Sequence, residues 1–210
     1  MRYVLPAFPF LFVLCSRTFR DDSAKTNRLS RLTMRLAALA VVTVAVSSLR
    51  ICPHSLSYFN EASGGPENGG FHLLSSNVAW GQDLTALRDW LDDHPEVDQL
   101  GLAVHCNFDP RALGIEFSLP PAGGAVAVDQ STLRSPLQWY AVDANLLYGY
   151  PYMIPDGNGG RFRAYDRQFQ WFRQFVPVAR AGYSINIYEL SHDDLRAAGF
   201  TVEPDADHLP

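Results

Sequence analysis

The sequence has few of the residue patterns that mark a metal centre. It contains only three cysteines in 210 residues, and no two of them form a Cys-x-x-Cys pair, which argues against a structural zinc site. The histidines lack metal-ligand spacings such as His-Glu-x-x-His. The acidic residues between positions 89 and 98 lack the glycine-spaced loop that binds calcium. We therefore predict no metal site and no cofactor.

A phosphate-binding loop and a basic surface are lacking as well. The glycine-rich stretch GGPENGG at 64–70 has neither Gly-x-Gly-x-x-Gly spacing nor a lysine, so it is read as a linker or surface turn. After Ile51 there are nine basic residues against twenty acidic ones. This excess argues against nucleic acid as a partner, because binding the phosphate backbone requires a basic face. Up to Ile51 there are eight basic residues and two acidic ones, so the two parts are expected to face different surroundings.

Two apolar segments mark residues 1–51 as a membrane region. The first, 3–15, spans only about 20 Å as a helix, whereas the twenty residues of the second, 32–51, are enough to cross a hydrocarbon core of about 30 Å. The loop 16–35 is rich in arginine, so the positive-inside rule places it in the cytoplasm. We predict two transmembrane helices in the cytoplasmic (inner) membrane, in contact with the lipid bilayer. Everything after Ile51 is then extracytoplasmic.

Two alternatives for the N-terminal part remain open at this point. Residues 3–15 have the length of a signal-peptide core, although no small-x-small cleavage site follows them. Alternatively, translation starts at Met34, residues 36–46 form the signal and Ala45-Val46-Ser47 its cleavage site. All three interpretations export the C-terminal domain.

The rest of the chain has the pattern of one α/β domain over 71–200, preceded by a linker over 52–70 and followed by a tail over 201–210. Strands alternate with helices, which favours a small three-layer sandwich with a largely parallel sheet. A loop or insertion is expected over 122–137. The predicted helices are 83–93, 165–175 and one capped by Ser191 that ends near Gly199. The predicted strands are 72–77, 100–106, 115–119, 139–146 and 183–190.

The residues alone predict no catalytic constellation. His105 and Cys106 are adjacent in a predicted strand, so their side chains point to opposite faces and are expected to be structural. Aromatic residues are concentrated in 148–175. They fit either a sugar-stacking surface or core packing.

Five segments, read in order, carry a family resemblance. They are RYVLPAFPFLFV at 2–13, PHSLSYFNEASGGPENG at 53–69, SNVAWGQDLTALRDWL at 76–91, WYAVDANLLYGYP at 139–151 and FVPVARAGYSINIYEL at 175–190. Together they resemble the C-terminal part of multi-pass bacterial glycosyltransferases of the dolichyl-phosphate-mannose protein mannosyltransferase-like type, which form family 39 and have the GT-C fold. The resemblance covers nearly the whole chain.

The resemblance implies an enzyme that takes a sugar from a polyprenyl-phosphate donor at the outer face of the membrane. It also implies an extracytoplasmic domain after the last helices. In such families the catalytic acid lies in the first extracytoplasmic loop, and no position of this sequence matches it. We therefore expect a C-terminal fragment of a membrane glycosyltransferase, inactive on its own and without an assignable catalytic residue. The alternative is a non-catalytic, membrane-tethered or secreted module that binds glycan or protein.

The pattern SYFN…GG…SN…WGQDL is fairly specific to this family, and its last part, 75–83, can be compared with the family block. The family block usually reads Asp-Ser-Asn-x-Asp-Trp-Gly-Gln-Asp, and here Ser75 and Ala79 replace two of its acids. The matching positions are Asn77, Trp80, Gly81, Gln82 and Asp83.

We interpret the block from Asn77 to Asp83 as a structural junction between the first predicted strand and the first predicted helix. Gly81 is expected to allow a tight turn, and the Asp83 carboxylate to favour the positive end of the helix. We expect the Trp80 ring to be buried beneath the helix and Gln82 to lie on the surface. A rival interpretation is that an exposed Trp80 beside Asn77 and Gln82 binds a sugar.

Overall fold

The structure is a computed structural model that describes residues 8–16, 28–123 and 137–200. The chain divides into two compact units, Met1–Cys52 and Pro53–Pro210. The predicted tail 201–210 and nearly all of the predicted loop 122–137 lie outside the described residues.

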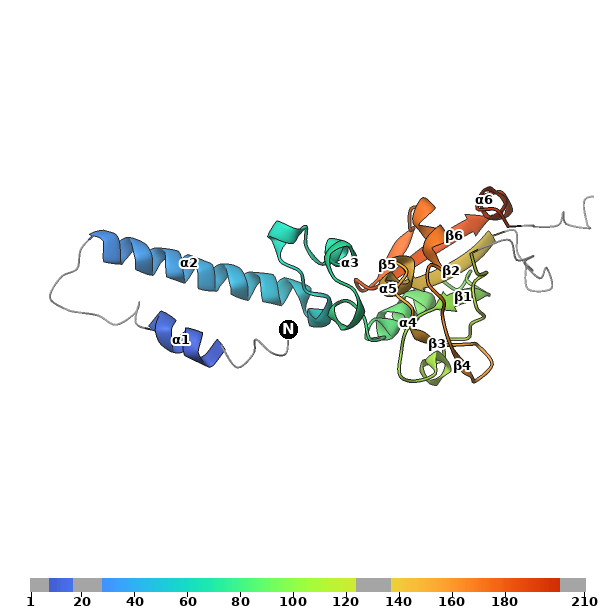
Figure 1. Cartoon of the computed structure of the whole chain (residues 1–210), viewed down its shortest axis with the longest axis horizontal. Helices are drawn as coiled ribbons and strands as arrows, with labels where there is room; N and C mark the ends of the chain where they lie inside the picture. The colour runs from blue at the N-terminus through green and yellow to red at the C-terminus, as the bar shows by residue number, and fades with distance from the viewer. Residues whose placement is uncertain (1–7, 17–27, 124–136, 201–210) are drawn as a thin grey trace, which may run out of the picture. The chain divides into compact units, whose positions relative to one another are not determined.

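The first unit contains helices α1 (Phe8–Ser16) and α2 (Arg28–Ile51) (Figure 1). Within α2, the 21 residues Arg31–Ile51 have a mean hydropathy of 1.9 and are long and apolar enough to cross a membrane. Among the described residues this is the one such helix. The nine residues of α1 would extend over only about 14 Å. The structure therefore contains one candidate spanning helix rather than the two that the sequence predicted.

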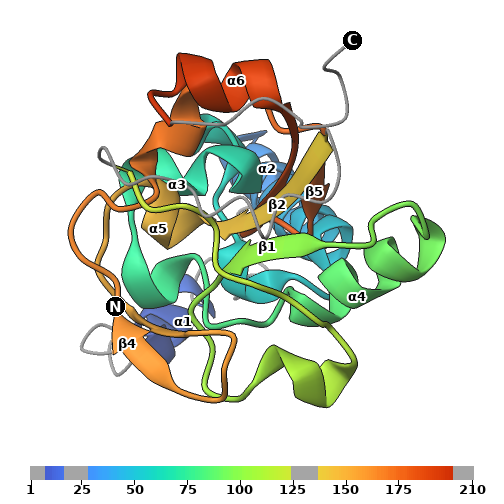
Figure 2. The same cartoon turned by 90° about the vertical axis from the view of Figure 1, so that its right-hand side faces the viewer.

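The second unit is a mixed α/β fold built on a four-stranded sheet of order β1-β2-β6-β5. β1 and β2 are parallel and lie side by side in Figure 2, whereas β2–β6 and β5–β6 are antiparallel. A separate hairpin pairs β3 with β4. The strands are β1 (Leu100–Ala103), β2 (Leu137–Asp143), β3 (Met153–Pro155), β4 (Arg161–Arg163), β5 (Ala179–Ala181) and β6 (Ile185–Ser191).

The prediction of a largely parallel sheet is therefore wrong, and the reason lies before β6. A parallel arrangement needs a crossover connection, usually a helix. The helix predicted over 165–175 forms only the short 3₁₀ helix η9 (Gln170–Gln174), and β5 then turns directly into β6. A short turn between neighbouring strands makes them antiparallel. The predicted strand 115–119 likewise contributes only one bridge, between Gly101 and Ser118.

Both faces of the sheet are covered by apolar side chains. Alternate residues of a strand point to opposite faces, and the buried residues of β2 follow this rule. Tyr140 and Val142 join a cluster that includes Phe169, Phe172 and Leu195. Ala141 joins a second cluster with Leu84, Leu87, Leu102 and Ile187. The sheet thus packs against α4 (Leu84–Asp93) on one side and against α5 (Ala144–Leu147), η9 and α6 (His192–Ala197) on the other.

Local signals placed two helices correctly. α4 begins after Asp83 and ends before Pro95, and Arg88 lies 3.5 Å from Asp92 one turn later. α6 follows a capping box in which Ser191 and Asp194 bond each other's backbone and side chain. The helices of this unit are α3 (Gly69–His72), α4 (Leu84–Asp93), α5 (Ala144–Leu147) and α6 (His192–Ala197).

The segment before α4 differs from its prediction. Residues 72–77 were expected to form a strand, but they contain the end of α3 and the 3₁₀ helix η6 (Ser75–Asn77). The segment predicted as a linker, 52–70, lies almost wholly in the second unit and contains η3 (Ser55–Ser57), η4 (Glu61–Ser63) and η5 (Pro66–Asn68). Ser57 in this segment is buried. These short turns bring His54 and Ser57 to the start of α4.

Candidate functional site

The block 77–83 connects η6 to α4 and makes a close approach at Gly81. This residue has φ +83°, and a Cβ added there would lie 2.6 Å from the Cβ of Cys106. Only glycine combines this backbone conformation with such an approach at little cost. The tight turn predicted at Gly81 is confirmed, and it brings the loop before α4 against His105 and Cys106, which follow β1.

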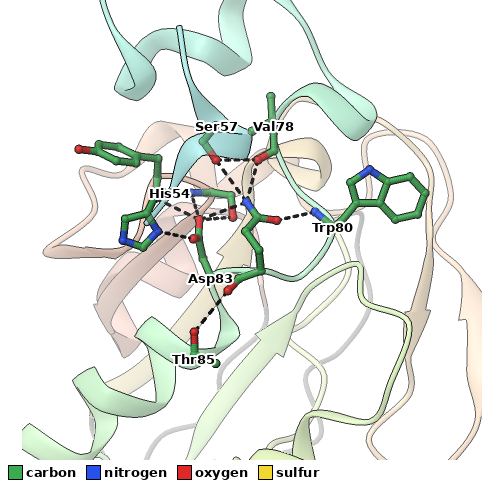
Figure 3. A network of polar contacts seen from close by, with 9 residues as sticks. His54, Ser57, Val78, Trp80, Asp83 and Thr85 are labelled. Atoms are coloured by element: carbon green, nitrogen blue, oxygen red, sulfur yellow. Dashed lines mark hydrogen bonds and ion pairs between the residues drawn. The ribbon is translucent and has the colours of Figure 1, made fainter. Parts of the chain in front are cut away.

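Asp83 is the centre of a buried polar network (Figure 3). Its side chain is fully buried and lies 2.8 Å from His54 Nδ1 through Oδ1. Its Oδ2 accepts hydrogen bonds from Tyr183 N at 3.1 Å, Ser184 N at 2.9 Å and Ser184 Oγ at 2.7 Å. Asp83 occupies the residue before α4 but makes no side-chain cap bond. Its carboxylate therefore joins three chain segments at the start of α4.

Gln82 belongs to the same network and is not the surface residue that the sequence suggested. Its Oε1 accepts from Trp80 N at 2.7 Å, and its Nε2 donates to Val78 O at 3.0 Å and Ser57 Oγ at 3.2 Å. Ser57 Oγ in turn donates to Val78 O at 2.8 Å (Figure 3). Each end of the amide has a backbone partner, so Gln82 fixes the loop that leads into α4.

Trp80 was predicted to be buried, but it lies at the surface. The residue is 40% exposed, so its ring is not buried beneath the helix. The ring lies beside the imidazole of His105, with 5.4 Å between the ring centroids. The turn at Gly81 separates Trp80 from the residues that enter α4, and this leaves the indole at the surface.

Gln82→Ala is expected to lower the free energy of unfolding by about 1–3 kcal/mol, because Trp80 N, Val78 O and Ser57 Oγ lose a partner. Denaturant unfolding of the full chain in detergent micelles, followed by tryptophan fluorescence, measures this change. All four tryptophans lie after residue 52, so the signal reports on the second unit. Arg88→Ala on the exposed face of α4 is the control. A change within about 0.5 kcal/mol, as expected for a surface position, would contradict the network.

A second group of polar side chains follows the parallel strands β1 and β2. Their carboxyl ends lead to His105 and Asp143, and such ends are where α/β sheets usually bind ligands. Asp143 is fully buried and accepts from Asn145 N at 2.7 Å and His105 N at 3.4 Å. Asn145 Oδ1 accepts from Ser75 N at 2.6 Å. This group therefore connects the carboxyl ends of both strands to η6.

Burial raises the pKa of Asp143 to about 7, and the nearby Asp83 adds to the increase. A carboxyl with this pKa keeps its proton in the folded chain at pH values where the unfolded chain has lost it. The stabilising contribution of the protonated Asp143 should therefore be complete below about pH 4 and should be lost as the pH rises to about 7. From the ordinary value of 3.8, the loss is on the order of 4 kcal/mol.

This pH dependence should be absent from Asp143→Asn, which cannot ionise. The measurement is the unfolding free energy of both chains in micelles between pH 4 and 8. We expect the advantage of the wild type over Asp143→Asn to shrink steadily up to about pH 7. Parallel pH curves for the two chains would show that Asp143 does not titrate in this range.

The sequence prediction that His105 and Cys106 form no catalytic pair agrees with their contacts. Cys106 Sγ donates to Phe108 O at 3.0 Å, and burial raises the pKa of this thiol to about 11. A protonated, buried thiol is a poor nucleophile. Among the residues that the structure describes, no group of three His, Cys, Asp or Glu side chains is placed to hold a metal ion.

Of the block's predicted positions, the structure brings Gln82 and Asp83 into one network with His54, Ser57 and Ser184. Asn77 lies apart from them and donates to Leu74 O at 3.0 Å. Sequence reasoning missed His54, Ser184 and Asp143. For Asp143 there was one local signal, its position in the apolar run WYAVDANL. An acid in a buried strand needs specific hydrogen-bond partners, so it indicates a buried polar group.

Comparisons with known proteins add no family to these observations. No protein-family model matches this sequence. The curated proteins and the solved structures give no match either.

Proposed function

We propose that this chain is the C-terminal part of an integral-membrane glycosyltransferase that uses a polyprenyl-phosphate-linked sugar donor. In this proposal residues 1–51 are the membrane region, with a span over 32–51, a shorter apolar segment at 3–15 and a cytoplasmic loop at 16–35. The α/β unit is extracytoplasmic. The chain contributes structure and sugar recognition and transfers no sugar by itself, because none of its residues matches the family's catalytic acid.

The observation that carries the proposal is the meeting of the resembling segments at Asp83. His54 and Ser57 come from 53–69, Gln82 and Asp83 from 76–91, and Ser184 from 175–190. The fourth segment, 139–151, joins through Ala144 N, which donates to Ser184 O at 2.8 Å. Segments that resemble one family and lie up to 101 residues apart are joined by hydrogen bonds in one place. This is expected where a family conserves one structural unit.

The network also supports a structural role for the block rather than a catalytic one. A general base must reach the proton that it removes. Both oxygens of Asp83 are already bonded, and its side chain is fully buried. Asp83 therefore holds the junction together. In this proposal, none of the residues in its network catalyses sugar transfer.

The membrane assignment rests on charge and on α2. The apolar side chains of this helix are exposed along its length, as at Leu39, Val44 and Leu49. Exposed leucine and valine on a 21-residue apolar stretch suit contact with lipid. The arginines before this stretch suit the cytoplasmic side.

A second candidate function is a membrane-tethered or secreted module that binds glycan without taking part in transfer. The exposure of Trp80 favours it, since an indole at the surface gives a sugar a flat apolar face.

The experiment is donor binding by the full chain in lipid nanodiscs. Polyprenyl-phosphate mannose and polyprenyl-phosphate glucose are the probes, and unglycosylated polyprenyl phosphate is the control. We expect at least one sugar-bearing lipid to bind more tightly than the control, with no transfer to an acceptor peptide. Equal binding of all three lipids would refute the proposed sugar-linked donor. Sugar transfer by this chain alone would refute the proposal that it has no transferase activity by itself.

A further inference from the structure

His105 has an unsatisfied polar atom at the centre of an aromatic group. Its Nδ1 lies 2.9 Å from Met153 O. Because a carbonyl oxygen can only accept, Nδ1 carries the hydrogen, and in the neutral ring Nε2 is then a lone-pair acceptor. Nε2 is one of two buried side-chain atoms in the described residues that have no hydrogen-bond partner. Buried polar groups nearly always have one, so this acceptor calls for a donor.

Aromatic rings surround the imidazole on two sides. Tyr152 stacks on it with 3.9 Å between centroids and an interplanar angle of 11°. Trp80 lies at 5.4 Å, and Tyr150 lies 5.0 Å from Tyr152. Trp80 and Tyr150 are 40% and 41% exposed, whereas His105 is 6% exposed. The group therefore has exposed rings at its rim and a buried acceptor at its centre.

The polar atoms beside these rings already have hydrogen-bond partners. Tyr152 OH bonds Ser75 Oγ at 2.6 Å, and Ser75 adopts φ +66°, an uncommon conformation for a residue other than glycine. Arg161 donates to Met153 O at 3.3 Å and to Cys106 O. These bonds hold Tyr152 and the carbonyl of Met153 in place. The position of the imidazole between them is thus fixed in advance of any ligand.

We propose that Trp80 and His105 form a subsite for one neutral pyranose ring. The apolar face of the sugar stacks on Trp80, and a sugar hydroxyl donates to His105 Nε2. A pyranose combines these two features, an apolar face and hydroxyl donors. Because Nε2 is shielded from solvent, binding includes a change of side-chain rotamer, which is common at binding surfaces. Trp80 is the exposed neighbour of the imidazole and is the ring that moves.

This inference rests on the proposed function only for the source of the sugar, which is the lipid-linked donor or a glycan acceptor. The probes are therefore soluble methyl α-mannopyranoside and methyl β-glucopyranoside, with polyprenyl-phosphate mannose as a separate arm. Binding to the full chain in micelles is measured by saturation-transfer NMR and by tryptophan fluorescence. If a soluble glycoside binds and the lipid-linked sugar does not, the subsite stands and the donor assignment fails.

Two variants test the two parts of the subsite. Trp80→Ala removes the stacking face. His105→Asn keeps an amide nitrogen that can bond Met153 O but removes the acceptor at Nε2. We expect each to weaken glycoside binding by about tenfold or more, which corresponds to about 1.4 kcal/mol. Tyr165→Ala, an exposed aromatic outside the group, should bind as the wild type does.

Folding of each variant is checked by near-ultraviolet circular dichroism, and Trp80→Phe provides a milder change that retains an aromatic face. Absence of glycoside binding by the folded wild type would overturn the proposal. Unchanged binding by folded Trp80→Ala would also overturn it. If His105→Asn binds as the wild type does while Trp80→Ala does not, the role of Nε2 is refuted.

Discussion

Asp83→Ala should lower the free energy of unfolding by about 3–5 kcal/mol, because each buried donor left without its acceptor costs about 1–3 kcal/mol. Three donors, Tyr183 N, Ser184 N and Ser184 Oγ, lose their acceptor together with His54 Nδ1. Water cannot replace the carboxylate easily, because the side chain is fully buried. Each unsatisfied donor adds its own desolvation cost.

The measurement is denaturant unfolding of the full chain in micelles, followed by tryptophan fluorescence. Asp89→Ala is the matched control, since this carboxylate is 74% exposed and lies in α4, the helix that follows Asp83. It should change the unfolding free energy by no more than about 0.5 kcal/mol. If the two variants unfold at the same denaturant concentration, Asp83 does not hold the junction.

Gly182→Ala should destabilise the same junction from the opposite side, by about 2–5 kcal/mol. Gly182 has φ +57°, and an added Cβ would lie 2.2 Å from the Cγ of Asp83. The left-handed backbone costs a residue with a Cβ about 1–2 kcal/mol. Forcing the carboxylate away adds an overpacking cost of about 1–3 kcal/mol.

Gly114→Ala separates these two contributions. Gly114 has φ +77°, and no atom of the described residues lies within 4 Å of an added Cβ, so only the cost of the backbone conformation applies. Both variants are compared in the same unfolding experiment as Asp83→Ala. Equal losses for Gly182→Ala and Gly114→Ala would mean that the contact with Asp83 has no energetic weight.

The features that the sequence predicted well depend on residues close together in the chain. α4 follows from apolar residues at helical spacing between Asp83 and Pro95, and α6 from a capping box within four residues. β1 and β6 follow from short runs of apolar or alternating residues. Each of these signals lies within one element, so one sequence suffices to read it.

The features that the sequence missed depend on distant partners. The bonds of Asp83 reach residues 29 and 101 positions away. The positive φ of Ser75, which prevents a strand there, accompanies a bond to Asn145, 70 positions later. No periodicity reports such a contact. The exposure of Trp80 was missed as well, because tryptophan side chains are highly buried on average and no local pattern shows that this ring lies at the surface.

The orientation of the chain in the membrane is the most direct test of the account, because an extracytoplasmic domain behind a cytoplasmic arginine-rich loop is its central claim. In bacterial cells, a reporter enzyme that is active only outside the cytoplasm is fused either after Pro210 or after Lys25. The account predicts activity from the fusion after Pro210 and none from the fusion after Lys25. Activity from the Lys25 fusion, with none after Pro210, would place the α/β unit in the cytoplasm and contradict the account.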